Sequence, residues 1–394
     1  MKFRIISRRK LGSVKEDFFS LFKKHDLSLV KKFEDNFTDF IGSKYIVFVP
    51  SARYGMKIIL ESLNLKDGDE VIVPAYTLGA LIGIIKSLKL KVVPVDIDAR
   101  TFNIRVDLIA RKITSKTKAI IVTHMFGNPC EMDSILGIAK DKSIYVIEDC
   151  AHAVGSKFKN RKVGSFGVAS FFSFDTTKTI NTYGGGCIVT NNQDLYLAIQ
   201  GNLKSQNLKR SMPYKKIIFT FLEDTLSSTI FFYPIDFLLS SSWGHRKVFQ
   251  LYKSMQSLTS FKCAFTVYQA SLGLKKLAEL NKKIAKRKKM ADFLKKGLRK
   301  DIVIQEINPD SSTNYYFYVV MGAINAAKVR LELLKHGIDC GIQSEVADDC
   351  ADILGFQDCP DAKRLYQYGI QIPFYESLTK SNIVYILNLL NNLL

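Results

Sequence analysis

The sequence predicts an α/β protein with a mostly parallel central sheet, helices on both faces of that sheet, and a smaller C-terminal α+β domain. Short runs of β-branched residues alternate with helical stretches from about residue 45 to 190, and each run is apolar throughout. Strands covered on both faces have this continuous apolar character, which is typical of parallel sheets. A chain of 394 residues can bury one large core and a smaller one.

The expected elements of the first domain follow one another in a regular order. Strands are predicted at residues 45–51, 70–74, 91–95, 118–124, 144–148 and 187–190, with helices at 53–63 and 80–88. Ligands of parallel α/β sheets bind at the carboxyl ends of the strands. The first candidates for a functional site are therefore the residues that follow each run, namely 51–54, 75–78, 124–127 and 149–152.

The rest of the chain predicts a second domain. It contains a long helical stretch, a strand-like run at residues 315–321, a helix at 326–336 and a closing helix from Ser381. We place the domain boundary so that residues 1–255 form an N-terminal segment and the large domain, and residues 256–394 form the smaller one.

The segment at about residues 215–243 departs from the α/β rhythm. It is strongly apolar, but charged residues and a proline interrupt it, so no uninterrupted run approaches the roughly 20 residues of a transmembrane helix. We interpret this apolar insertion as part of a core or a subunit interface. Peripheral contact with a membrane, aided by Lys215 and Lys216, is the alternative.

Charge and cysteine content narrow the class of protein. The net charge of +20 favours anionic ligands or surfaces, but residues 275–300, which carry much of it, have the pattern of a solvated helix face. No nucleic-acid-binding signature accompanies the charge. The seven cysteines form no CxxC pair and no zinc-like spacing, and the N-terminus lacks an apolar signal core. We therefore expect a cytoplasmic protein with reduced thiols and no metal site.

Three local features carry the chemistry. Asp149 comes directly after the buried strand in VIEDCAHAVG, Lys178 lies in a turn after a further apolar strand in SFFSFDTTK, and a triple glycine follows at residues 184–186. Taken alone, the aspartate could cap a helix, the lysine could be a solvated turn residue, and the glycines could form a tight turn. Together they supply the groups that one class of cofactor requires. A cofactor that acts as an electron sink requires an amine, a carboxylate for its ring nitrogen, and donors for its phosphate.

At these residues the sequence resembles the DegT/StrS-type sugar aminotransferases, whose fold is the fold type I of pyridoxal-phosphate (PLP) enzymes. The resemblance runs through ordered blocks along nearly the whole chain, including GSKYIVFVPSARYGMKIIL, DGDEVIVPAYT, VIEDCAHAVGS, GSFGVASFFSFDTTKTI, YQASLGLKKL and GIQIPFYESLT.

The resemblance implies a role for each matching residue. Lys178 would bind PLP as a Schiff base and then move protons, Asp149 would pair with the pyridinium nitrogen, and His152 would lie beside the ring hydroxyl. Leu78 stands where an aromatic residue often covers the ring. The residues implied for the phosphate are Ser173, Ser51, Ala52, Arg53, Tyr54 and, in place of an Asn–x–Arg pair from the neighbouring subunit, Lys262.

Two further departures concern the substrate. Gly184 replaces a glutamate that usually precedes the double glycine, and the His-containing motif that often contacts the sugar is not recognisable at residues 315–317. These changes leave the cofactor chemistry intact but make the usual nucleotide-sugar acceptor less certain.

The implied activity is PLP-dependent transfer of an amino group from L-glutamate to a keto sugar, in cell-surface polysaccharide or lipopolysaccharide biosynthesis, by a homodimer with shared sites. An alternative acceptor is an oxidised 3-deoxy-octulosonate, aminated at C8. Family dehydratases carry His in place of the lysine, so Lys178 favours transamination. Outside this class, the alternatives are a non-catalytic regulator that keeps the fold and a membrane-associated assembly protein.

Overall fold

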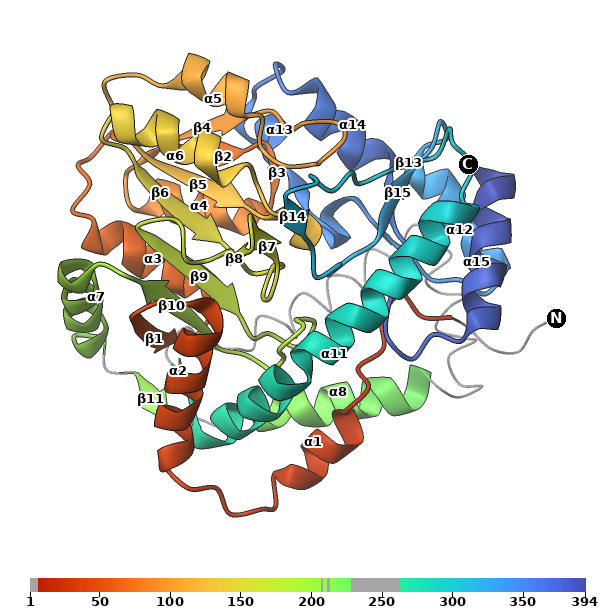
Figure 1. The fold of residues 1–394 in the computed structure, drawn as a ribbon, viewed down its shortest axis with the longest axis horizontal. Helices are drawn as coiled ribbons and strands as arrows, with labels where there is room; N and C mark the ends of the chain where they lie inside the picture. Colours follow the sequence, from red (N-terminus) through yellow and green to blue (C-terminus); the bar gives the residue numbers. More distant parts are fainter. Residues whose placement is uncertain (1–5, 207, 211–212, 228–262) are drawn as a thin grey trace.

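The protein is described here by a computed structural model that covers residues 6–206, 208–210, 213–227 and 263–394 (Figure 1). Its centre is a seven-stranded sheet in the order β1-β10-β9-β6-β5-β2-β4. The strands are β1 (Tyr45–Val49), β2 (Glu70–Pro74), β4 (Lys91–Val95), β5 (Thr117–Thr123), β6 (Tyr145–Asp149), β9 (Ala169–Ser173) and β10 (Gly186–Thr190). Their bounds lie within a few residues of the predicted runs.

The sheet is mostly parallel, as predicted. Strands β4, β2, β5, β6 and β9 run in one direction, and β10 is antiparallel to both of its neighbours, β9 and β1. Alternate residues of each strand enter two different cores. Val71 and Val73 of β2 pack with one helical layer, whereas Ile72 packs with the other. Both faces are therefore buried, which explains why the strands are apolar at every position.

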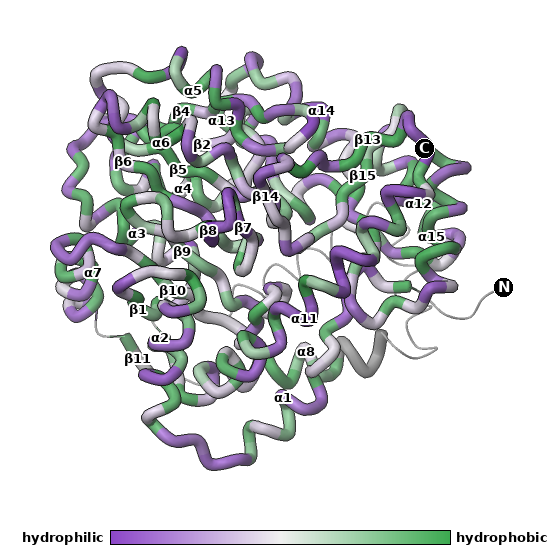
Figure 2. The backbone as a smooth tube through the Cα atoms, viewed as in Figure 1, coloured by the Kyte–Doolittle hydropathy of each residue, from purple (hydrophilic) through white to green (hydrophobic). Residues whose placement is uncertain are grey.

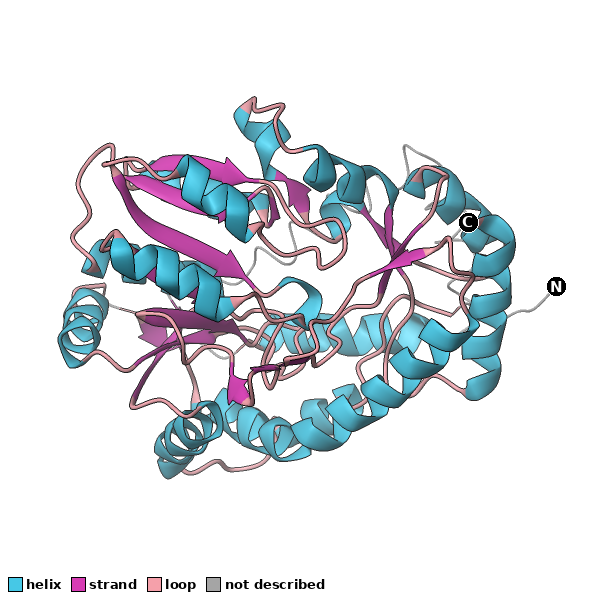
Figure 3. Cartoon of the chain, turned by 45° about the horizontal axis from the view of Figure 1, so that its top comes forward, coloured by secondary structure: helices cyan, strands magenta, loops and turns pink. Residues whose placement is uncertain are grey.

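Helices cover both faces of this sheet (Figure 3). One layer consists of α3 (Ala52–Ser62), α4 (Gly79–Ser87) and α7 (Gln193–Lys204). The opposite layer consists of α5 (Val106–Lys112), α6 (Met132–Asp141), α2 (Ser28–Ile41) and the first half of α11 (Val267–Gly297). Figure 2 shows hydrophobic residues gathered around the central sheet, while hydrophilic residues line much of α11.

A smaller unit packs beside the large sheet. Its antiparallel sheet has the order β13-β15-β18-β16 and is covered by α12 (Ala326–Lys335) and α15 (Lys380–Leu393). The strands are β13 (Val303–Ile304), β15 (Val319–Met321), β16 (Gly341–Ile342) and β18 (Gly369–Gln371). The strand predicted at 315–321 is thus too long, because Tyr315 has a φ of 49° and turns the chain away from an extended path.

Short elements connect these units. They are β3 (Tyr76–Thr77), β7 (Lys157–Phe158), β8 (Arg161–Lys162), β11 (Lys209–Arg210), β12 (Cys263–Ala264), β14 (Ser311–Ser312), β17 (Asp348–Asp349), α13 (Cys350–Leu354), α14 (Pro360–Tyr368) and 3-10 turns at Met125–Gly127 and Gln343–Glu345. Two of them link the C-terminal part of the chain to its N-terminal part through small separate sheets, since β17 pairs with β3 and β14 pairs with β7.

Helix α11 joins the two cores. Ala270 and Leu280 lie in a core of the large sheet, whereas Met290 and Leu294 lie in that of the small sheet. The boundary predicted between residues 255 and 256 lies outside the described residues and remains a prediction.

The basic stretch of α11 is not solvated at every position. The ammonium of Lys276 is buried and lies 2.6 Å from the buried carboxylate of Asp17 in α1 (Val14–Ser20). The same Nζ donates to the Asn181 carbonyl oxygen at 2.8 Å. The prediction of a solvated face is therefore wrong at Lys276. A buried lysine in a run of lysines cannot be recognised without its partners, because only the tertiary fold supplies the opposite charge.

The apolar insertion is described only in its first part. Residues Tyr214–Ser227 form α8, which packs against α1, with the rings of Phe18 and Phe221 stacked 4.6 Å apart. Among the described residues, no helix combines the length and the apolar character needed to span a bilayer.

Candidate active site

The candidate site lies at the carboxyl ends of the central parallel strands. Asp149 is the last residue of β6, and it is paired with Thr123 at the end of β5 and with Phe171 in β9. Parallel strands end at the same edge of a sheet, so the residues that follow them are brought together there.

Asp149 is buried and held in one orientation. Its Oδ1 accepts a hydrogen bond from the Ala151 N–H at 3.0 Å, within the turn that follows the strand. Burial raises the pKa of Asp149, although the Ala151 N–H and the charge of Lys178 act in the opposite direction. A cation placed beside this carboxyl would favour its ionised form. A protonated pyridine nitrogen is a cation of this kind.

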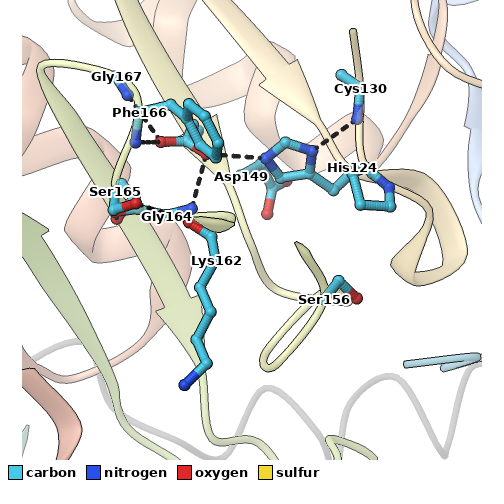
Figure 4. Close-up of polar contacts among 12 residues, drawn as sticks. His124, Cys130, Asp149, Ser156, Lys162, Gly164, Ser165, Phe166 and Gly167 are labelled. Atoms are coloured by element: carbon cyan, nitrogen blue, oxygen red, sulfur yellow. Dashed lines mark hydrogen bonds and ion pairs between the residues drawn. The ribbon is translucent and has the colours of Figure 1, made fainter. Parts of the chain in front are cut away.

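The residue before Asp149 is the centre of a buried polar network (Figure 4). The Glu148 carboxylate accepts hydrogen bonds from the backbone N–H groups of Gly164, Phe166 and Gly167, each at 2.7 Å. His124 lies 3.1 Å from the same carboxylate through Nε2, while its Nδ1 accepts from the Cys130 N–H at 3.0 Å. His124 therefore donates from Nε2. The network fixes the loop and the strand end behind Asp149.

The same network includes a possible metal-binding cluster, formed by His124, Glu148 and Cys150 with ligand atoms within 4.8 Å of one another. Both ring nitrogens of His124 are already hydrogen-bonded, as are both oxygens of Glu148. Burial raises the pKa of the Cys150 thiol well above its ordinary value. We therefore assign this cluster to the support of Asp149.

Lys178 is half-buried and lies against an aromatic residue. Its Nζ lies 4.8 Å from the centre of the Tyr316 ring, and the Tyr316 hydroxyl is 3.3 Å from Thr177 Oγ1. A cation over an aromatic face is stabilised by the ring. Tyr316 comes from the small unit, so the lysine is enclosed by parts of the chain that are far apart in sequence.

His152 stacks on the other members of this aromatic group. Its ring lies 4.3 Å from that of Tyr316 and 6.3 Å from that of Phe126. Burial, together with the charge of Lys178, lowers the pKa of His152 well below its ordinary value. Its Nδ1 is buried and has no hydrogen-bond partner in the described part of the chain. A neutral ring with an unpaired nitrogen can receive a polar group of a bound molecule.

The phosphate-binding residues predicted from the sequence meet at Gly186. This glycine pairs with Ser173, and a Cβ at Gly186 would lie only 2.8 Å from the Ala52 nitrogen. Ser51 is the N-cap of α3 and accepts a hydrogen bond from the Tyr54 N–H at 3.2 Å. The glycine run thus lets β10 pass close to the first turn of α3. The N-terminus of a helix beside a serine hydroxyl suits a phosphate.

The remaining residues predicted for the cofactor site have fewer contacts that tie them to it. Arg53 lies in the first turn of α3, and the half-exposed Leu78 is the N-cap residue that precedes α4. Leu78 follows Thr77, whose hydroxyl is 3.3 Å from that of Thr123 at the end of β5. Lys262 lies outside the described residues, so its role remains a prediction.

Sequence reasoning missed several residues that the structure adds to the site. They are Glu148 and Tyr316, and also Gln269, whose Nε2 donates to the carbonyl oxygens of Thr182 and Gly184 at 3.3 and 3.0 Å. His124, by contrast, was among the predicted candidates, because it lies at the end of an apolar run. The missed residues act through contacts between distant segments, which leave no local pattern.

The donor set fits PLP. Lys178 supplies an amine and Asp149 a buried carboxylate, while His152 has an orphaned ring nitrogen. Ser173 and the start of α3 supply anion-binding groups. The arrangement can therefore hold the cofactor at both ends and present an amine to it.

Comparisons with known proteins agree with this geometry. The model of the DegT/DnrJ/EryC1/StrS aminotransferase family matches residues 26–391. The uncharacterized protein MJ1066 of Methanocaldococcus jannaschii is 30% identical over 91% of this chain and 88% of its own. The GDP-perosamine synthase of Escherichia coli O157:H7 is 29% identical over 92% of this chain and 89% of its own.

A solved structure has the same fold. The PLP form of the putative sugar aminotransferase Spr1654 from Streptococcus pneumoniae aligns with a TM-score of 0.76 and 22% identity, covering 100% of this chain and 98% of that one.

Proposed function

This chain belongs to the DegT/DnrJ/EryC1/StrS aminotransferase family, and we propose that it transfers the amino group of L-glutamate to a keto sugar used in cell-surface polysaccharide or lipopolysaccharide biosynthesis. It is a PLP-dependent aminotransferase. The observation that carries the proposal is the enclosure of Lys178 with His152 and Tyr316 beside the end of β6, where Asp149 lies.

Each residue has a distinct task in this proposal. When bound, PLP supplies an electron sink for the substrate carbon. Lys178 holds the cofactor and then carries a proton to and from that carbon, which needs an amine free to move. Asp149 would hold the ring nitrogen in its protonated form, and the neutral His152 would lie beside the ring hydroxyl. Ser173 and the start of α3 bind the phosphate and so fix the ring relative to Lys178.

The proposed acceptor is a nucleotide-linked keto sugar. The name of the relative GDP-perosamine synthase refers to a GDP-linked sugar, and this supports the choice. The alternative acceptor is an oxidised 3-deoxy-octulosonate, aminated at C8. Because both acceptors are anionic, the net charge of +20 suits either one. A non-catalytic regulator is disfavoured by the presence of Lys178 and Asp149 in the site.

An amino-transfer assay tests the proposal. Purified protein, PLP and L-glutamate are mixed with a panel of keto sugars, with and without a nucleotide, and formation of 2-oxoglutarate is followed. We expect 2-oxoglutarate in amounts that depend on one acceptor class, and none from Lys178→Ala. Lys159→Ala is the matched control, since that lysine lies on the surface and pairs with Asp133. Multiple turnovers by Lys178→Ala would contradict the proposal.

We also propose a cytoplasmic homodimer with shared sites. All seven cysteines lie in the described part of the chain and are free thiols, which supports a reducing compartment. In a dimer, Lys262 of each subunit would reach the phosphate bound by its partner. Light scattering should give twice the mass of one chain, and Lys262→Ala should weaken PLP binding without dissociating the dimer.

Peripheral contact with a membrane is a second candidate, in addition to catalysis. On α8, Tyr214, Ile218 and Leu222 are 51%, 45% and 50% exposed and recur every four residues along one face, next to the exposed Lys215. Lys216 does not belong to this face, because its side chain is only 9% exposed and forms an ion pair with Asp175. Sedimentation with anionic vesicles should fall when the three apolar residues are replaced by serine. Equal sedimentation of both proteins would rule this contact out.

A further inference from the structure

A carboxylate lies inside the turn that leads from the phosphate end of the site to the catalytic lysine. The N–H of Asp175 donates to Ser173 Oγ at 3.4 Å, and its carbonyl oxygen accepts from the Lys178 N–H at 2.9 Å. Its Oδ1 accepts from the Thr176 N–H at 2.7 Å. Asp175 is therefore a fixed part of the turn.

An unbalanced negative charge at this position would oppose cofactor binding in two ways. A phosphate monoester carries a charge of about −1.5 to −2 at neutral pH, so a nearby carboxylate repels it. Without a counter-charge, the same carboxylate would also disfavour the neutral amine that bond formation with an aldehyde requires.

Lys216 of α8 balances this charge. Its ammonium forms an ion pair with Asp175 Oδ1, and its side chain is only 9% exposed. The helix is held in place by Ile217 and Thr220, both of which are buried. Burial alone would raise the pKa of Asp175, but the Lys216 ammonium and the Thr176 N–H hold it below its ordinary value. Asp175 is therefore ionised and has Lys216 as its counter-charge.

We propose that Lys216 is a positioning residue of the cofactor site, which neutralises Asp175 and thereby allows the phosphate and the neutral amine of Lys178 to occupy the same turn. The inference rests on the proposed function, because it assumes that PLP binds at Lys178. It gives the start of the apolar insertion a role in the site.

The test compares three variants, Lys216→Met, Asp175→Asn and the double variant that carries both changes. PLP affinity is measured by titrating the apo-protein and following the visible band of the bound cofactor. On the holoenzyme, the absorbance of that band is followed as the pH changes, and the pH at the midpoint of this change is recorded as the pH midpoint. We expect Lys216→Met to weaken PLP binding about tenfold or more and to raise the pH midpoint, because the charge of Asp175 is no longer balanced.

The double variant should recover most of the affinity and the original midpoint, since it removes both charges. Asp175→Asn alone should bind PLP at least as tightly as the wild type. The control is Lys215→Met, on the exposed side of the same helix turn, which should behave as the wild type.

Wild-type affinity and midpoint in Lys216→Met would overturn the inference. So would a double variant as weak as Lys216→Met, because it would assign the loss to helix packing. A wild-type protein that forms no visible band with PLP would instead overturn the proposed function, so the two failures are distinguishable.

Discussion

Glu148→Gln perturbs the network behind Asp149 without changing the size of the side chain. The carboxylate accepts four hydrogen bonds, two at each oxygen, from Phe166 and Gly167 on one side and from Gly164 and His124 on the other. A glutamine oxygen can keep two of these bonds. The NH₂ group of the glutamine, which can only donate, must then face the other two donors.

The loss of stability follows from this count. His124 cannot turn its Nε2 into an acceptor without giving up the bond from Cys130 to Nδ1. Two buried donors therefore lose their acceptor, at a cost of about 1–3 kcal/mol each. We expect the free energy of unfolding to fall by about 2–6 kcal/mol. Urea unfolding followed by circular dichroism measures it.

The matched control is Glu306→Gln, whose carboxylate is 61% exposed and 4.0 Å from Arg100. Loss of this negative charge should change the free energy of unfolding by less than about 1 kcal/mol. If Glu148→Gln unfolds at the same urea concentration as the wild type, the buried network does not support the site in the way described.

Three further predictions concern the residues around Lys178. Asp149→Asn should lower kcat/KM about a hundredfold or more, because a neutral amide cannot stabilise a protonated ring nitrogen; a variant of wild-type activity would remove Asp149 from the mechanism. Burial lowers the pKa of His152, so its imidazole ring takes up a proton at a higher pH in the unfolded chain than in the folded one. Stability should therefore fall as the pH drops below about 6.5, and less so in His152→Gln, as urea midpoints at several pH values would show. Tyr316→Phe should keep PLP affinity, whereas Tyr316→Ala should lose about fivefold or more in titrations of the apo-proteins, because the ring packs on His152; equal affinities would mean that the ring does not support the cofactor site.

The parts of the fold that follow from local pattern were predictable. Strands buried on both faces are apolar at every position, so β2, β4 and β5 could be placed to within one or two residues. The rule that ligands bind at strand ends also singled out Asp149 and the start of α3. The chemistry of Lys178 needed more than its own position, because a lysine in a turn is ordinary.

The residues that sequence reasoning missed act across long separations. Tyr316 reaches Lys178 from the small unit, where Tyr315 breaks the strand expected there. Lys216 reaches Asp175 over 41 positions, and Lys276 reaches Asp17 over 259. A charged residue carries no local mark of a distant partner, and only the packed structure shows that its charge is balanced.

The absorbance spectrum of the purified protein with PLP tests most directly whether Lys178 is the residue that binds the cofactor. The wild type should show the visible band of Schiff-base-bound PLP, and this band should fall when L-glutamate is added without an acceptor. Lys178→Ala should lack the band, while Lys159→Ala should keep it. A wild-type protein without the band, or a Lys178→Ala variant with the same band and the same response to L-glutamate, would contradict the account.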